Sequence, residues 1–402
     1  MVFQLDLTGN VPLYGQEDCC WCGAASAQMI MNGYPNPADR LFFPQGPPTV
    51  PPNAPNCWDV IQANNSTNPA DTAPPGWCTD PLGLRGCLRA LNPPPAGTWN
   101  IFMDPNRDTV MFDILHWMNN NNYPVATLIN RGGHWIAILG YITDVQPLAG
   151  STPNLQQITI YDPEPHNVGS QITMTGAVWY ATDYVGPVNA NGSWLNQYVA
   201  VIEPPVAKGR VEVMEIKRVG ERIISPREAL EHVRKAIDER ELGKKRPYTI
   251  LKKRGIRNLQ PILVREQIKP GLEKERVPYY YIVPFGFETE TGVCDIPLAR
   301  LCVIVNAYTG QFEEITAFGR SIRYLPEKEA INVVAKAMHL KKEEIEKMLA
   351  EKVIKATMMF QPSEITHIRA YPFWKVAVKE RVLYVDQLGK LYKTIEPARP
   401  GD

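Results

Sequence analysis

A cysteine that follows a glutamine by six residues is the first feature of this sequence able to carry chemistry. From Cys22 onward, the Ala, Met and Ile content predicts a helix that ends near Asn32-Gly33. A helix N-terminus favours the thiolate, the nucleophilic form of cysteine. Gln16 lies far enough upstream to loop back and aim its amide at the oxyanion that forms when Cys22 attacks a carbonyl. The helix-end N–H of Cys22 would be the second donor.

A nucleophilic cysteine also needs an imidazole, and usually a group that orients it. His134 follows two glycines and opens an apolar run, residues 134–142, which predicts a strand. Asp162 closes the next strand-like run, residues 157–161. Adjacent antiparallel strands would bring the two side chains together, and the carboxylate would then fix the imidazole tautomer and stabilise the imidazolium. The sequence thus predicts a Cys22, His134 and Asp162 triad.

These motifs, in this order, resemble the papain-like cysteine peptidases, in particular the bacterial branches that process double-glycine leader peptides or act as secreted effectors. The resemblance covers roughly residues 10–200. It implies Cys22 as nucleophile, His134 as general base, Asp162 as the group that orients it and Gln16 as oxyanion-hole donor. Two positions depart from the pattern: Gly23 stands where many papain relatives have Trp, and Asp162 where papain itself has Asn.

Other interpretations of these residues stay open. Cys22 could be bonded in a disulfide, because Cys19 and Cys20 are close to it. No second Cys-x-x-Cys pair exists to complete a zinc site, so neither a metal nor a cofactor is predicted. His166 is a rival base, whereas His116 is expected to be structural. The alternative functions are a transglutaminase-type acyl transferase that uses the same triad, and a non-catalytic binding module on a peptidase fold.

The elements that must position these residues indicate an α+β fold. A helix near residues 109–119 precedes strand-like runs at 124–129, 134–142 and 157–161. Residues 35–105 are rich in proline and are expected to be irregular. Cys57, Cys78 and Cys87 lie in this region, and one or two disulfides are expected to pin it, with pairings that the sequence leaves open. The first domain is predicted to span residues 1–205.

Charge separates the two halves of the chain. The 402 residues contain 42 Lys+Arg and 42 Asp+Glu, yet residues 1–205 carry a formal charge of −10 and no lysine, so the remainder carries +10. The basic half is expected to dock on the acidic half. The basic stretch 243–276 lacks aromatic residues between its charges apart from Tyr248, so nucleic acid is not the expected partner. No apolar run approaches 18 residues, so no membrane span is expected. The expected partner is a peptide or protein substrate.

The second half resembles a tandem pair of PepSY-type domains, which are attached to secreted peptidases and modulate them. Similar helix starts at Pro226 and Pro326 each precede a pair of strand-like runs, with turn glycines at Gly310 and Gly389. The predicted units span residues 210–320, with a basic insertion, and 321–397. No signal peptide is visible, but a lysine-free, cysteine-bearing first half is typical of an exported protein, which predicts a secreted or cell-envelope location.

Overall fold

The computed structural model describes residues 2–33, 43–47, 55–68, 76–91, 99–190, 192–202, 209–215, 218–267, 277–287, 290, 297–396, 398, 400 and 401. The chain divides into two compact units. The first comprises Met1–Ile216 together with Ala398–Asp402, and the second comprises Lys217–Pro397. Both units combine helices with sheet, as an α+β protein does. Within the described residues, no helix is both long and apolar enough to cross a bilayer.

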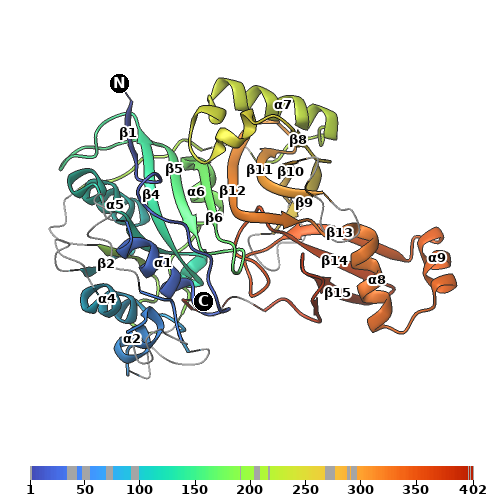
Figure 1. Ribbon diagram of the computed structural model, residues 1–402, viewed down its shortest axis with the longest axis horizontal. Coiled ribbons are helices and arrows are strands. Elements are labelled where there is room, and N and C mark those ends of the chain that lie inside the picture. Colours follow the sequence, from blue (N-terminus) through green and yellow to red (C-terminus); the bar gives the residue numbers. More distant parts are fainter. Residues whose placement is uncertain are drawn as a thin grey trace. The chain divides into compact units, whose positions relative to one another are not determined.

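The first unit is built on an antiparallel sheet in the strand order β6-β5-β4-β3-β7-β2, with β1 paired to β4 (Figure 1). Its strands β3 and β7 are buried along their whole length, so the sheet forms the core of the unit. The strands are β1 (Phe3–Asp6), β2 (Asn100–Asp104), β3 (Val125–Ile129), β4 (His134–Thr143), β5 (Leu155–Asp162), β6 (Ser170–Thr175) and β7 (Tyr198–Ile202).

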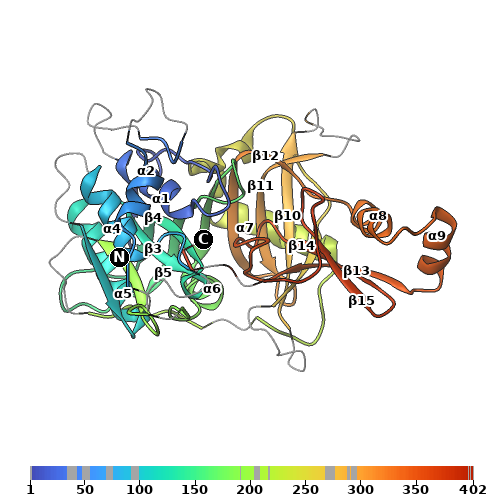
Figure 2. The ribbon, with the colours of Figure 1, turned by 90° about the horizontal axis from the view of Figure 1, so that it is seen from below.

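The described part of the first unit contains five α-helices. They are α1 (Cys22–Met31), α2 (Cys57–Asn64), α4 (Pro81–Ala90), α5 (Arg107–Asn121) and α6 (Gly176–Thr182). Helix α2 packs against α1 and α4, and the other four pack against the sheet. Helix α1 packs against β3 and β4, and α6 packs against β5 and β6 (Figure 2). Every residue of α1 is buried, which explains why its sequence is small and apolar apart from Ser26 and Gln28.

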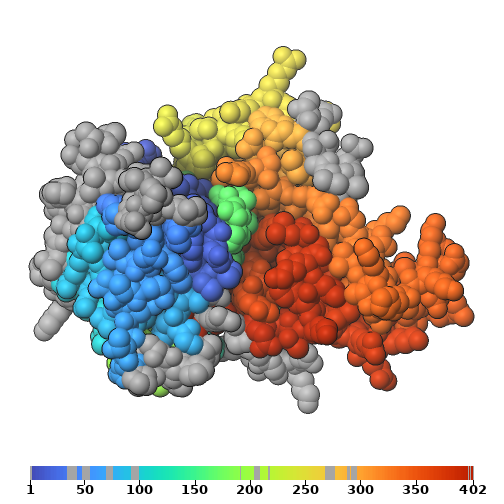
Figure 3. All heavy atoms as spheres, turned by 60° about the horizontal axis from the view of Figure 1, so that its bottom comes forward, coloured from blue at the N-terminus to red at the C-terminus, as the bar shows by residue number. Residues whose placement is uncertain are grey.

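Sequence patterns predicted the centre of the first unit and missed part of its periphery. The helix from Cys22 and the three strand-like runs are confirmed by α1, β3, β4 and β5. The expectation that residues 35–105 are irregular is wrong for α2, α4 and β2, and Figure 3 shows the residues of α2 and α4, in mid-blue, at the surface. Asn56 and Asp80 cap these two helices, and Pro81 is tolerated as the first residue of α4, where its missing N–H costs nothing.

The second unit has the strand order β16-β15-β14-β13-β9-β10-β11-β12, with β8 paired to β10. The strands are β8 (Ile256–Asn258), β9 (Ile262–Glu266), β10 (Tyr279–Phe287), β11 (Leu298–Asn306), β12 (Phe312–Arg323), β13 (Ile354–Phe360), β14 (Phe373–Val378), β15 (Arg381–Val385) and β16 (Leu391–Tyr392). Its helices are α7 (Pro226–Glu239), α8 (Glu327–Ala337) and α9 (Lys342–Ala350), and two short 3-10 turns, η3 (Leu242–Lys244) and η4 (Tyr248–Lys252), lie in the basic stretch.

The described residues of the second unit form two apolar cores. Helix α7 packs over β10 and β11, and α8 packs over β14 and β15. Helix α7 starts as the sequence predicts, with Ser225 and Glu228 forming a capping box around Pro226. Residues 268–276 of the basic stretch and Cys294 lie outside the described residues.

A buried ionic cluster lies within the second unit. The Arg369 side chain is 2% exposed, with its Nε atom 3.0 Å from Glu266 Oε1 and its Nη1 atom 3.5 Å from Glu314 Oε2, and it also pairs with Glu313. Arg218 pairs with Glu266 and Glu313. Burial alone would raise the pKa of Glu313, but the two arginines lower it to about 2.

Candidate active site

Cys22 is the first residue of α1, and its side chain is fully buried. The backbone N–H of Trp135 donates a hydrogen bond to Cys22 Sγ over 3.3 Å. Together with the helix N-terminus, this donor favours a negatively charged sulfur. Position 23 favours glycine for a steric reason, because a Cβ here would come within 2.4 Å of Thr79 Cγ2. The departure from Trp at this position therefore follows from the close packing of Thr79 on α1.

His134 is the first residue of β4 and pairs in register with Ile129 of β3. Its Nε2 atom lies 2.9 Å from Asp162 Oδ1, and both side chains are fully buried. Burial lowers the pKa of His134, but the charge and hydrogen bond of Asp162 and a hydrogen bond with Cys22 outweigh burial and hold it well above 6.5. Because Asp162 occupies Nε2, the ring nitrogen left for the thiol is Nδ1.

Asp162 is the last residue of β5, next to β4 in the sheet. Its Oδ1 atom also accepts the backbone N–H of Glu164 over 2.8 Å, which fixes the carboxylate at the strand end. The sheet thus brings together Cys22, His134 and Asp162 from α1, β4 and β5. This is the arrangement in which a carboxylate orients an imidazole beside a thiol.

Gln16 lies in the loop before α1 and is 3% exposed. Its backbone N–H donates to Pro163 O over 2.9 Å, which ties it to the loop after Asp162. Its side-chain Nε2 donates to Cys19 O over 3.4 Å, so in this structure the amide is directed at the backbone of its own loop. The role of Gln16 as an oxyanion donor stays a prediction.

The neighbouring cysteines differ from Cys22 in their surroundings. Cys19 is exposed, and its Sγ lies 3.6 Å from that of Cys20. Partial burial of the thiol, hydrogen bonds with Asp18 and Cys20, and the charges of both neighbours raise the pKa of Cys19 to about 12. A thiol with so high a pKa carries almost no thiolate at neutral pH, so Cys19 is a poor nucleophile.

The rival histidines lie in other surroundings. His166 is exposed, and its Nδ1 atom lies 2.6 Å from the side-chain nitrogen of Asn167. His116 lies on α5, where its Nδ1 atom is 2.8 Å from Pro147 O. The structure therefore gives His116 a place in the scaffold and pairs only His134 with both a carboxylate and a thiol among the described histidines.

Cys57 and Cys87 face each other between α2 and α4. Both are fully buried and unbridged in this structure, and a hydrogen bond between the two thiols is the main reason that the pKa of Cys87 is raised well above 9.0. The predicted disulfides remain a prediction, and this pair is the one whose thiols lie in mutual contact.

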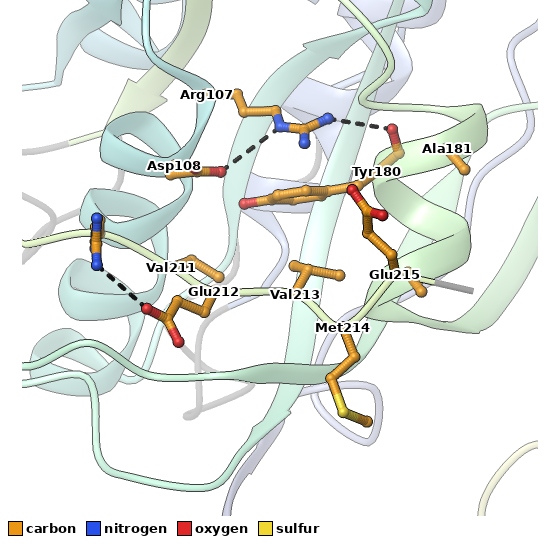
Figure 4. A pocket seen from close by; sticks show the side chains of 11 residues that line it. Arg107, Asp108, Tyr180, Ala181, Val211, Glu212, Val213, Met214 and Glu215 are labelled. Carbon is orange, nitrogen blue, oxygen red and sulfur yellow. Dashed lines mark hydrogen bonds and ion pairs between the residues drawn. The ribbon is translucent and has the colours of Figure 1, made fainter. Parts of the chain in front are cut away.

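A cavity of about 560 Å³ lies elsewhere in the first unit, between α5, α6 and residues 210–215 (Figure 4). Arg107 lies over the ring of Tyr180, 4.2 Å from its centroid, and its Nε is 3.6 Å from Asp108 Oδ1. None of Cys22, His134 and Asp162 lines this cavity. The candidate chemistry and this cavity are therefore separate.

Two further groups at the triad escaped sequence reasoning: the N–H of Trp135 and the backbone of Thr79. The Trp135 ring Nε1 donates to Thr79 O over 2.8 Å, so one tryptophan ties the sulfur and the residue 79 backbone together. No sequence signal marks Thr79, although the Trp that follows His134 could have pointed to the Trp135 N–H.

Scans of protein-family models, curated proteins and solved structures found no match to this chain.

Proposed function

We propose that this chain is a cysteine peptidase with a papain-like first unit, in which Cys22 attacks the carbonyl of a peptide bond. The observation that carries the proposal is His134, hydrogen-bonded to Asp162 on one side and to Cys22 on the other. A raised His134 pKa favours the imidazolium and thiolate pair, the form that a cysteine nucleophile needs.

The reaction has two steps. The Cys22 sulfur bonds to the carbonyl carbon, the C–N bond breaks, and the imidazolium of His134 gives its proton to the leaving amine. Neutral His134 then takes a proton from water, whose oxygen attacks the thioester and releases the acid and Cys22. Asp162 holds the ring in one tautomer through both steps.

The second unit and the location of the protein belong to the same proposal. The second unit contains two helix-on-sheet cores, in the regions whose sequence resembles PepSY-type domains, and these regions would modulate the peptidase. The composition of the first unit supports a secreted or cell-envelope protein.

Cleavage of an unfolded protein substrate by Cys22→Ala tests the peptidase proposal, with Cys19→Ala as the matched cysteine control. We expect Cys22→Ala to lose activity by at least about 10³-fold, the scale for losing a catalytic nucleophile, and Cys19→Ala to retain it. Unchanged cleavage by Cys22→Ala would rule out the proposal. Incorporation of an added primary amine, with no free acid formed, would assign acyl transfer instead.

A further inference from the structure

The sulfur of Cys22 lies beside a backbone carbonyl of its own chain. Its Sγ is 3.4 Å from the carbonyl oxygen of Gly401, 379 residues away in the sequence. Ala398–Asp402 belongs to the first unit, although residues 217–397 form the second.

Backbone hydrogen bonds hold this segment from two sides. Gly401 N–H donates to Gly132 O over 2.7 Å, and Cys78 N–H donates to Pro400 O over 3.1 Å. Gly132 is two residues before His134, and Cys78 directly precedes Thr79. These main-chain bonds hold the turn at Pro400 and Gly401 independently of side chains.

The Gly401 position has no room for a side chain. A Cβ on Gly401 would come within 2.0 Å of Thr79 O, and its φ of +67° lies in the left-handed region that glycine adopts most readily. The Trp135 ring holds Thr79 O through a hydrogen bond, so this oxygen cannot easily yield. Glycine is therefore a requirement of the position.

We propose that the segment containing Ala398, Pro400 and Gly401 is a ligand of the active site in cis, held through its backbone, and that it shields Cys22. The inference builds on the proposed function, because it treats Cys22 as the reactive group of the site that this segment covers. The fully buried state of Cys22 is consistent with such an occupant.

Alkylation of Cys22 by iodoacetamide tests the shielding without requiring turnover. We expect the Gly401→Ala substitution to displace the segment from the site. The alkylation rate of Cys22 should then rise by at least about tenfold, the size of effect expected when a tethered ligand is released. Gly150→Ala is the matched control, since Gly150 also has a positive φ, +81°, but nothing within 4 Å of the added Cβ. Cys57, fully buried, must stay unlabelled, which shows that the fold is intact.

Adding a free peptide tests the glycine requirement. N-acetyl-Ala-Arg-Pro-Gly amide at millimolar concentration is expected to restore protection of Cys22 in the Gly401→Ala chain, whereas N-acetyl-Ala-Arg-Pro-Ala amide is not. Equal alkylation rates of Gly401→Ala and the unaltered chain, or equal protection by both peptides, would overturn the inference.

The peptidase proposal and the ligand proposal can fail separately. If Gly401→Ala releases the segment and the free peptide protects Cys22, but no substrate is cleaved, the ligand proposal holds and the peptidase proposal is rejected. If cleavage depends on Cys22 but Gly401→Ala leaves the alkylation rate unchanged, the peptidase proposal holds and the ligand proposal is rejected.

Discussion

Replacing Asp162 with Asn should shift the upper pH limit of activity downward. The carboxylate holds the pKa of His134 above 6.5 through its charge and a 2.9 Å hydrogen bond. Asn keeps an acceptor for the Glu164 N–H, so the local turn survives. A hydrogen bond between charged groups is worth about 1.5–3 kcal/mol. Asn removes the charge on one side of this bond, so the His134 pKa should fall.

Two readouts measure this shift: the pH dependence of kcat/KM on a peptide, and that of Cys22 alkylation in the Gly401→Ala background. The imidazolium is lost as pH rises through the His134 pKa, so the alkaline limb of both profiles should move to lower pH. Asp59→Asn, an exposed change on α2, should leave both limbs in place. An unmoved alkaline limb in folded Asp162→Asn would refute the idea that Asp162 governs His134.

The same coupling bears on folding. A group whose pKa is raised in the folded state stabilises that state fully below its unfolded value, here 6.5 for His134, and loses this contribution as pH rises through the folded value. Asp162→Asn should therefore destabilise the first unit more at pH 6 than at alkaline pH, as measured by urea unfolding.

Three further outcomes are expected. Mild oxidation should join Cys57 to Cys87, seen as a linked peptide by mass spectrometry, and should stabilise the first unit by about 3–4 kcal/mol for a loop of about thirty residues. Arg369→Met should cost the second unit about 3–5 kcal/mol in urea unfolding by leaving buried carboxylates uncompensated, and the stabilisation from Glu313, present above pH 4.5, should be lost as pH falls through about 2. If the basic half docks on the acidic half, raising salt should change peptidase activity in the full chain, and a salt-independent activity would argue against docking.

Sequence reasoning reached the triad because each member has a local signal. Cys22 begins a helix of small residues, His134 begins an apolar strand after two glycines, and Asp162 ends a strand before proline. The pairing of β4 with β5 is the one expected of consecutive strands, which are usually neighbours. The packing of α1 against β4, which brings Cys22 to His134, has no local signal.

Elements with weak local signals were missed. Helices α2 and α4 are short and lie among prolines, and only the caps Asn56 and Asp80 mark where they begin. Strand β7 is an apolar run of five residues, too short for periodicity to separate a strand from a helix. Helix α9 has no fully buried residue, and its apolar face is narrow, with the partly buried Ile345 and Met348 packed against the second core.

The contact of Gly401 with Cys22 could not be predicted from any local pattern, because its two partners are 379 residues apart and its specificity lies in an absent side chain. The described contacts give the bound segment two backbone hydrogen bonds, a weak hold for a free peptide. Chain connectivity compensates, because it makes rebinding of the segment an intramolecular event. A free peptide lacks this advantage and must therefore be added at about millimolar concentration to replace it.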